Sequence, residues 1–327
     1  MVASQMEFYP NFLFSNPHLQ TIIPHQFRKV PKIDYNRERV ELLDGDFIDL
    51  DWSINQNTKL CILLHGLESN SNRTYIYGMV HALKTQNYDV VVMNLRGCSG
   101  ESNRLFSAYH SGKTDDLNEI MNHINNVSKY QEVNLIGFSL GANIVLKYLG
   151  EYKNKFPIPL HKAVAISCPC DLSSSSRRLE HWSNKIYHDR FLHSLKNKLL
   201  LKKAFYPDLI HETKIRELET LREFDEYYTA PVHGFESAKN YYEKASSKQY
   251  ISEIEIPTLL ITAQDDPFLS FECMPYKEVK NNKQIFFLNP RKGGHVGFLQ
   301  NIQQQIYWHE QKTIDFITEI DISLFVK

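Results

Sequence analysis

A short apolar run ending in Gly-Phe-Ser-Leu-Gly constrains this chain more than any other stretch. Residues 133–136 have the character of a buried strand, the motif occupies 137–141, and residues 142–148 have helical spacing. A serine at the tip of a tight strand-to-helix turn needs neighbours without bulk, and the two glycines provide them. Such a turn would expose the Ser139 hydroxyl and aim the Leu140 N–H at a developing oxyanion. The pattern predicts a nucleophilic serine, and a glycine-rich turn with an idle serine is the alternative.

The strands and helices around this motif predict an α/β fold. Nearly continuous apolar strands that alternate with helices indicate a mostly parallel central sheet with helices on both faces. Asp44-Gly45, between two strand patterns, predicts an antiparallel hairpin before that sheet. The expected strands are 38–43, 47–52, 60–64, 89–93, 133–136, 163–167, 258–262 and 284–288, and the expected helices of the sheet domain are 74–84, 115–127, 142–148 and 311–320.

Two segments depart from this alternation. Residues 6–34 are rich in Pro, Asn and aromatics, and their prolines argue against a long helix. Residues 173–250 have little strand character and predict an inserted helical cap, with helices such as 191–203 and 214–223. We therefore expect a single domain over residues 1–327 with a cap at 173–250.

Composition excludes several classes of function. The formal net charge of −1 provides no positive electrostatic field that would attract nucleic acid. The five scattered cysteines suit reduced thiols, and Cys168-Pro169-Cys170 lacks a second pair of ligands at metal-binding spacing. The first residues do not resemble a signal peptide, and no apolar run reaches membrane-spanning length. These features predict a cytoplasmic protein without a metal or organic cofactor.

A serine nucleophile needs a base and a carboxylate that orients the base. Asp265-Asp266-Pro267 follows the strand at 258–262, and His295 stands between glycines after the strand at 284–288. The chain order Ser139, Asp266, His295 is the order that hydrolases of this kind use. Asp266 is preferred to Asp265 because the following proline favours an extended backbone.

The second oxyanion donor is expected in the loop after residues 60–64. His65-Gly66-Leu67 occupies that position, which makes the Leu67 N–H the partner of the Leu140 N–H. A simple turn at the end of the strand is the alternative.

Another spacing, His110-x4-Asp115, has a form associated with acyl transfer. We favour a loop followed by a helix start, because Asp115 would interact with the helix dipole.

The expected cap helix carries Phe191, Leu192, Leu195 and Leu199 on one face. That face could cover an acyl pocket while the lysines face solvent or lipid head groups, which makes the cap a candidate for peripheral membrane contact. An ordinary amphipathic helix docked on the sheet domain is the favoured alternative.

Several segments along the chain together have the pattern of one known family. They are Asn16–Thr21, His65–Glu68, Arg96–Gly100, Tyr109–Gly112, 137–141, Phe224-Asp225 with Thr229–Pro231, Ala263–Pro267 and Gly293–Gly297. On these segments the chain resembles the YheT-like branch of the α/β-hydrolase fold superfamily. The resemblance implies a serine esterase or lipase-like hydrolase that acts on acyl esters, with short- to medium-chain acyl or lipid esters as substrates. Eukaryotic relatives cleave medium-chain acyl groups from phospholipids, or make and break medium-chain ethyl esters.

Two further functions remain open at this stage. An acyltransferase would use the same acyl-enzyme with an alcohol in place of water. A non-catalytic binding protein could also use a hydrolase fold, because fold alone does not prove function. The sequence does not fix the oligomeric state.

Overall fold

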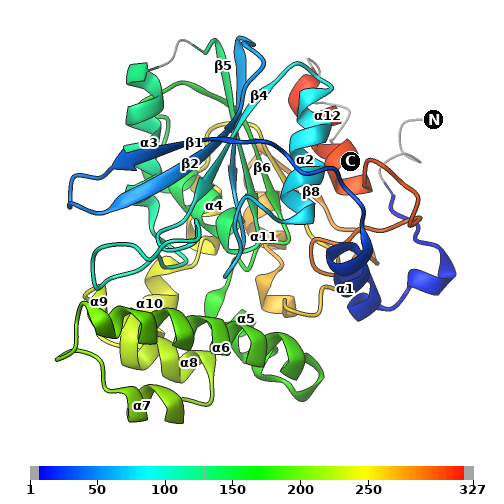
Figure 1. Cartoon of the computed structure of the whole chain (residues 1–327). Helices are drawn as coiled ribbons and strands as arrows, with labels where there is room; N and C mark the ends of the chain where they lie inside the picture. The colour runs from blue at the N-terminus through cyan, green and yellow to red at the C-terminus, as the bar shows by residue number, and fades with distance from the viewer. Residues whose placement is uncertain (1–6, 128–129, 320–327) are drawn as a thin grey trace.

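A mixed β-sheet lies at the centre of the computed structural model, which describes residues 7–127 and 130–319 (Figure 1). Its strands are β1 (Asn36–Glu41), β2 (Phe47–Ser53), β3 (Lys59–Leu64), β4 (Asp89–Asn94), β5 (Glu132–Phe138), β6 (Leu160–Ile166), β7 (Thr258–Ile261) and β8 (Ile285–Leu288). They lie in the order β1-β2-β4-β3-β5-β6-β7-β8. β2 pairs antiparallel with β1 and with β4, and the remaining pairs are parallel. The predicted fold, a mostly parallel sheet with an N-terminal hairpin, is confirmed.

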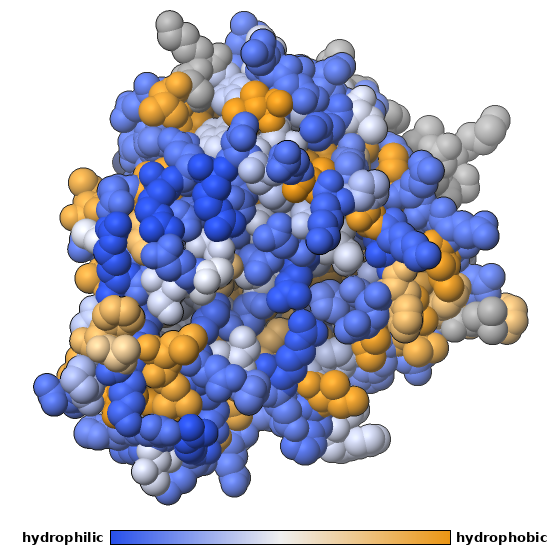
Figure 2. All heavy atoms as spheres, in the orientation of Figure 1, coloured by the Kyte–Doolittle hydropathy of each residue, from blue (hydrophilic) through white to orange (hydrophobic). Residues whose placement is uncertain are grey.

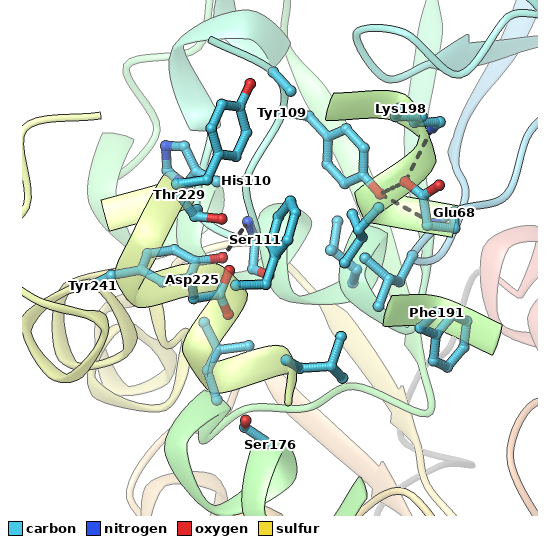
Figure 3. Close-up of a pocket in the computed structure, with 18 of the residues that line it drawn as sticks. Glu68, Tyr109, His110, Ser111, Ser176, Phe191, Lys198, Asp225, Thr229 and Tyr241 are labelled. Carbon is cyan, nitrogen blue, oxygen red and sulfur yellow. Dashed lines mark hydrogen bonds and ion pairs between the residues drawn. The ribbon is translucent and has the colours of Figure 1, made fainter. Parts of the chain in front are cut away.

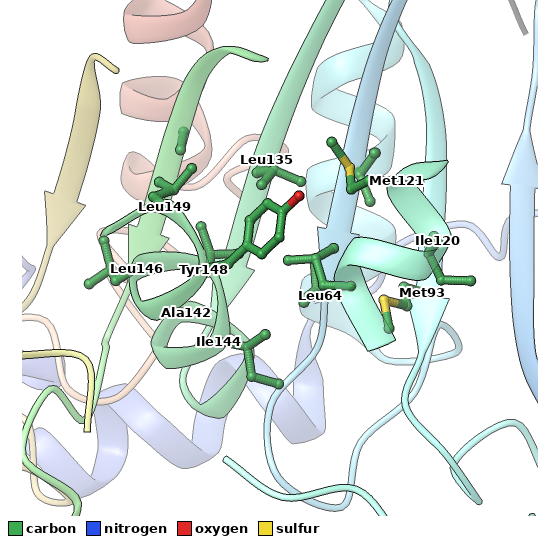
Figure 4. Close-up of a cluster of buried hydrophobic side chains, with 14 of the residues drawn as sticks. Leu64, Met93, Ile120, Met121, Leu135, Ala142, Ile144, Leu146, Tyr148 and Leu149 are labelled. Atoms are coloured by element: carbon green, nitrogen blue, oxygen red, sulfur yellow. The ribbon is translucent and has the colours of Figure 1, made fainter. Parts of the chain in front are cut away.

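Helices cover both faces of this sheet, as Figure 1 shows. On one face, α3 (Thr114–Val127) and α4 (Leu140–Tyr152) pack on a cluster that includes Leu60, Ile62 and Leu64 of β3 (Figure 4). On the other face, α2 (Thr74–Lys84) and α12 (Trp308–Thr318) pack on a cluster that includes Cys61 and Leu63. Successive residues of one strand thus enter opposite cores, which explains the continuous apolar runs in the sequence. Of the helix expected at 311–320, Ile320 lies outside the described residues.

The expectation of irregular structure at residues 6–34 is wrong for part of that segment. It contains α1 (Pro17–Phe27), an eleven-residue helix. The side chain of Asn16 caps its start by accepting from two backbone N–H groups, and Pro17 occupies the first turn, where its missing N–H is not needed. Pro24 lies inside the helix without ending it.

Every regular element between β6 and β7 is helical. In Figure 1 most of these helices gather below the sheet, beyond the carboxyl ends of its parallel strands, whereas the last of them packs against α4. They are α5 (Leu172–Glu180), η3 (Trp182–Asn184), α6 (Lys185–Leu201), η4 (Lys202–Ala204), α7 (Glu212–Glu217), α8 (Leu221–Phe224), η5 (Asp225–Thr229), α9 (Ala230–Val232), α10 (Ala238–Ala245) and η6 (Lys248–Glu253).

Several helix boundaries differ from the sequence prediction. For example, α4 begins at Leu140 and α12 at Trp308, against the expected 142 and 311. The single helix expected at 214–223 is broken into α7 and α8, because Thr220 adopts an extended backbone and begins α8 with a capping box to Glu223. The helix expected at 191–203 begins six residues earlier, at Lys185. The remaining elements of the described chain are η2 (Phe12–Phe14), η7 (Phe271–Cys273) and α11 (Tyr276–Lys280).

No helix within the described ranges has the length and apolar character needed to cross a bilayer. Figure 2 shows the face of the molecule that is seen in Figure 1. On this face, hydrophobic residues form small groups over the cap and around the N-terminal segment, with hydrophilic residues between them.

Candidate active site

Ser139 lies at the tight turn between β5 and α4, with φ at 51°. A non-glycine residue with positive φ is strained, and such strain persists only where the surrounding structure enforces it. A Cβ on Gly137 would lie 2.5 Å from the carbonyl oxygen of Gly141, and a Cβ on Gly141 would lie 2.5 Å from that of Leu64. Strand and helix therefore approach so closely that both positions require glycine.

The structure brings Ser139, Asp266 and His295 into contact. His295 Nε2 lies 2.9 Å from Ser139 Oγ, and His295 Nδ1 lies 2.8 Å from Asp266 Oδ2. The Asp266 side chain is buried, and its Oδ1 also accepts from the Phe268 N–H at 2.9 Å. The Phe268 ring packs on the imidazole, with 4.2 Å between ring centroids. A base that contacts both a serine and an orienting carboxylate is the arrangement that activates a serine.

Asp265 has a different environment from Asp266. Its Oδ1 accepts from the Gly294 N–H at 3.0 Å, and its Oδ2 lies 3.8 Å from Lys292 Nζ. Burial is the main cause that raises the pKa of Asp265. Its contacts therefore hold the loop that precedes His295, whereas the imidazole contacts Asp266.

Two backbone N–H groups beside Ser139 have no acceptor among the described residues, those of Leu67 and Leu140. Both residues line the same cavity as Ser139. The amides on either side of Leu67 are occupied, because they donate to the hydroxyls of Tyr75 and Tyr109 at 3.1 Å. Free amide donors beside a serine can stabilise the negative charge that forms on a carbonyl oxygen under attack.

Helix α1 holds the loop that carries His295, a role that the sequence analysis missed. The Thr21 hydroxyl accepts from the His295 N–H at 3.0 Å. The Gln20 amide bonds both backbone groups of Leu299, each at 2.8 Å. A Cβ on Gly297 would lie 2.1 Å from the Gln20 carbonyl oxygen, so this contact excludes any side chain there. In the sequence, the Asn16–Thr21 segment belongs to the proline-containing region 6–34, and only the family resemblance points to a role for it.

Two cavities meet at Ser139. The cap cavity, of about 140 Å³, lies between the sheet domain and the cap and is lined by Leu140, Leu172, Leu195, Leu199 and Leu269, among others. The N-terminal cavity, of about 370 Å³, lies between α1, the start of α2 and α6. Both cavities include Leu67, Glu68, Ser139, Phe191, Phe268 and His295 in their walls.

The expected orientation of the cap lysines is wrong for two of them. Lys198 and Lys202 line the cap cavity, together with Phe191, Leu195 and Leu199 of the predicted apolar face. Lys198 Nζ lies 3.0 Å from Glu68 Oε1, which also accepts from the Tyr109 hydroxyl at 2.7 Å (Figure 3).

Lys202 is 5% exposed and donates to Asn103 Oδ1 at 2.8 Å. Burial lowers the pKa of Lys202 to about 8. These ammonium groups turn inward because a carboxylate and carbonyl-type oxygens are available there, a feature that helical periodicity does not reveal.

The far side of the cap cavity carries a second group of polar residues, which Figure 3 shows around Asp225 and Tyr241. Burial raises the pKa of Asp225 to about 6, while its Oδ2 accepts from the Tyr242 hydroxyl at 2.7 Å. His110 lies in the same wall, where burial lowers its pKa well below the ordinary value. Asp115, its partner in the His-x4-Asp spacing, instead forms an ion pair with Lys113 in the first turn of α3.

The five cysteines are free thiols and all are buried. In residues 7–127 and 130–319, no group of three or more His, Cys, Asp or Glu side chains is placed to hold a metal ion.

Comparison with known proteins agrees with this fold. The model of the α/β-hydrolase fold family matches residues 60–302. The chain belongs to the α/β-hydrolase fold family. Within this family it is YheT-like. It is 35% identical to the "Putative esterase YheT" of Escherichia coli (strain K12), over 97% of this chain and 94% of that protein.

Two further comparisons agree with the α/β-hydrolase fold. Phospholipase ABHD3 of Mus musculus is 28% identical over 90% of this chain and 74% of that protein. The solved structure of the Pyrococcus furiosus esterase Pf2001 superposes with a TM-score of 0.58 at 17% identity, over 89% of this chain and 97% of that chain. The predicted membership of a YheT-like family is confirmed.

Proposed function

We propose that this carboxylic ester hydrolase cleaves acyl esters through a covalent acyl-enzyme on Ser139. The observation that carries the proposal is the continuous contact from Ser139 Oγ to His295 Nε2 and from His295 Nδ1 to Asp266, at 2.9 and 2.8 Å. The family membership supports ester hydrolysis as the reaction class.

The first half of the reaction forms the acyl-enzyme. Ser139 Oγ attacks the ester carbonyl carbon while its proton passes to His295 Nε2, and Asp266 stabilises the resulting imidazolium through Nδ1–H. The carbonyl oxygen becomes an oxyanion that accepts hydrogen bonds from the Leu67 and Leu140 N–H groups. The carbon–oxygen bond to the alcohol then breaks, and His295 gives its proton to the leaving alkoxide.

The second half regenerates the enzyme. Water attacks the acyl carbon as His295 Nε2 takes one of its protons, and a second oxyanion forms at the same two amides. Collapse of this intermediate breaks the bond to Ser139 Oγ, which recovers the proton from His295. The product is the free carboxylic acid, and apart from the attacking water every catalytic group in these steps is a side chain or a backbone amide of the protein.

The cap cavity is the site we assign to the acyl chain. Leu140 at the oxyanion turn and Leu195 and Leu199 of α6 give it an apolar wall that begins beside Ser139. Burial of each methylene group in such a wall contributes about 0.8 kcal/mol. We assign short to medium acyl chains to this cavity, whose wall the cap helps to form, and the alcohol part then points to the N-terminal cavity.

Labelling with a fluorophosphonate tests the nucleophile, because this reagent phosphonylates activated serines. Mass spectrometry of digested wild-type protein should find the adduct on the peptide with Ser139, and Ser139→Ala should remain unlabelled. Ser252→Ala, a change at an exposed serine, is the matched control and should label as wild type. A stable adduct on another serine, or equal labelling of Ser139→Ala, would reject the proposal.

Transfer of the acyl group to an alcohol would proceed through the same intermediate. Products measured with and without added ethanol separate the two outcomes, because only transfer yields an ethyl ester in place of the free acid.

A further inference from the structure

The N-terminal cavity carries positive charge that no carboxylate in its wall neutralises. Arg73, Arg190 and His25 line it, and Glu68 is the only carboxylate among its described wall residues. Glu68 is already engaged, because its Oε1 lies 3.0 Å from Lys198 Nζ and accepts from a tyrosine hydroxyl.

Arg190 is exposed, and within this group it contacts a histidine. Both terminal nitrogens of Arg190 lie 3.4 Å from His25 Nε2, so the guanidinium faces a neutral imidazole instead of a carboxylate. Burial, Arg190 and Arg73 all lower the pKa of His25, and burial and Arg73 lower that of Arg190. Arg73 and Arg190 therefore bring two positive charges to the wall of one cavity, and an anion bound there would offset their repulsion.

Another arginine in the same cavity provides the contrast. Arg28 forms two hydrogen bonds with the Glu310 carboxylate, at 2.5 and 2.7 Å, and both side chains are buried. Its charge is thus neutralised within the protein. The charges of Arg73 and Arg190 remain available to a ligand.

The cavity places these charges beside the candidate nucleophile. Ser139 and His295 belong to its wall, together with Thr74 in the first turn of α2. An acyl ester at Ser139 with its chain in the cap cavity must extend its alcohol part into this space.

We infer that Arg73 and Arg190 bind a phosphate group carried by the alcohol part of the substrate while the scissile ester lies at Ser139. Guanidinium groups match phosphate oxygens in geometry and remain charged at any physiological pH. The substrate class is then an acyl ester of a phosphorylated alcohol. This inference rests on the proposed function, because it locates the phosphate relative to the reacting ester.

A matched pair of soluble esters tests the inference: butyrylglycerol and butyrylglycerol 3-phosphate. Wild-type protein should have the higher kcat/KM for the phosphorylated ester. Arg73→Gln and Arg190→Gln should each lower that value roughly 10- to 100-fold, the loss expected for one charge-assisted hydrogen bond, and change the uncharged ester much less. Arg216→Gln is the control, because Arg216 pairs with Glu212 on the cap surface and belongs to neither cavity wall.

Binding provides a readout that does not depend on turnover. Isothermal titration calorimetry with glycerol 3-phosphate should detect binding to the wild-type protein that both arginine variants weaken. If neither ester is hydrolysed but glycerol 3-phosphate binds through these arginines, the anion site stands and the proposed function fails.

Three results would overturn the inference. They are equal kcat/KM for the two esters in the wild type, equal losses for both esters in the arginine variants, and no binding of glycerol 3-phosphate. Association with phosphatidic acid vesicles that the substitutions abolish, with equal turnover of the two soluble esters, would assign the arginines to a membrane surface and reject a substrate phosphate.

Discussion

The side chain of Gln20 forms two hydrogen bonds with the backbone of Leu299. Its Nε2 donates to the Leu299 carbonyl oxygen and its Oε1 accepts from the Leu299 N–H, each at 2.8 Å. Gln20 is fully buried, and the two residues lie 279 positions apart in the chain. This contact joins α1 to the loop that presents His295 to Ser139.

Gln20→Ala should therefore lower both stability and activity. The substitution leaves the N–H and the carbonyl oxygen of Leu299 without partners, which costs roughly 1–3 kcal/mol for each unsatisfied group. Urea unfolding measures the stability change, and kcat for a p-nitrophenyl ester reports on the placement of His295. Gln303→Ala, at an exposed glutamine, is the control, and equal behaviour of the two variants would contradict a clamp at Gln20.

The two adjacent aspartates should differ sharply. Asp266→Asn removes the carboxylate that contacts His295 Nδ1, and loss of such a carboxylate lowers turnover about 10⁴-fold. Asp265→Asn should retain most of the activity, because this side chain contacts the Gly294 N–H and not the imidazole. Rates near neutral pH, with circular dichroism as a check on folding, compare the variants. The reverse order would move the orienting role to Asp265.

Leu195 should help to set the acyl-chain length. Leu195→Trp fills part of the cap cavity, so the ratio of kcat/KM for p-nitrophenyl octanoate to that for the acetate should fall by roughly tenfold or more. Leu201→Trp is the control on the same helix, because Leu201 is 65% exposed. An unchanged ratio in Leu195→Trp would place the acyl chain elsewhere.

Asp225 should make stability depend on pH in a specific window. Burial raises the pKa of Asp225 from 3.8 to about 6, so the folded state binds more protons than the unfolded state between these values. Titration of Asp225 therefore lowers the free energy of unfolding of the wild type as the pH rises from about 4 to about 6. Asp225→Asn removes the titration, and its stability relative to the wild type should increase across the window by at most ~1.4 kcal/mol per pH unit. Urea unfolding of both proteins at several pH values measures it, and a pH-independent difference would contradict the shift.

Much of the site could be predicted from local sequence because its chemistry is local. Ser139 is marked by flanking glycines that the strand-to-helix turn requires, and His295 by the glycines of its loop. The choice of Asp266 rests on two close neighbours, Ala263 at the end of the strand and Pro267 directly after it. Fold class followed from the same reasoning, since strands buried on both faces have continuous apolar runs.

Contacts between distant segments could not be predicted in this way. The prolines of the N-terminal segment suggested irregular structure, whereas Pro17 begins α1 and Pro24 lies within it. The attachment of that helix to the His295 loop depends on residues almost a whole chain apart. Lys202 turns inward because its ammonium group donates a hydrogen bond to Asn103 Oδ1 of another loop. The apolar periodicity of α6 carries no information about that partner.

Membrane contact by the cap stays a prediction. Trp182 and Ile186 are 81% and 77% exposed just before and at the start of α6, and Ile186 also lines the N-terminal cavity. Flotation with anionic liposomes tests it, and association that high salt weakens would support the contact. Absence of any salt-sensitive association would remove it.

The rate of ester hydrolysis by Ser139→Ala tests most directly whether Ser139 is the nucleophile. Hydrolysis of a short p-nitrophenyl ester by the variant and by the wild type at equal concentration gives the ratio of turnover. We expect a loss on the order of 10⁴- to 10⁶-fold with an unchanged circular dichroism spectrum, because the base and the carboxylate have no nucleophile to activate. Hydrolysis by a folded Ser139→Ala at a rate comparable to that of the wild type would contradict the assignment of Ser139 as the residue that carries the reaction.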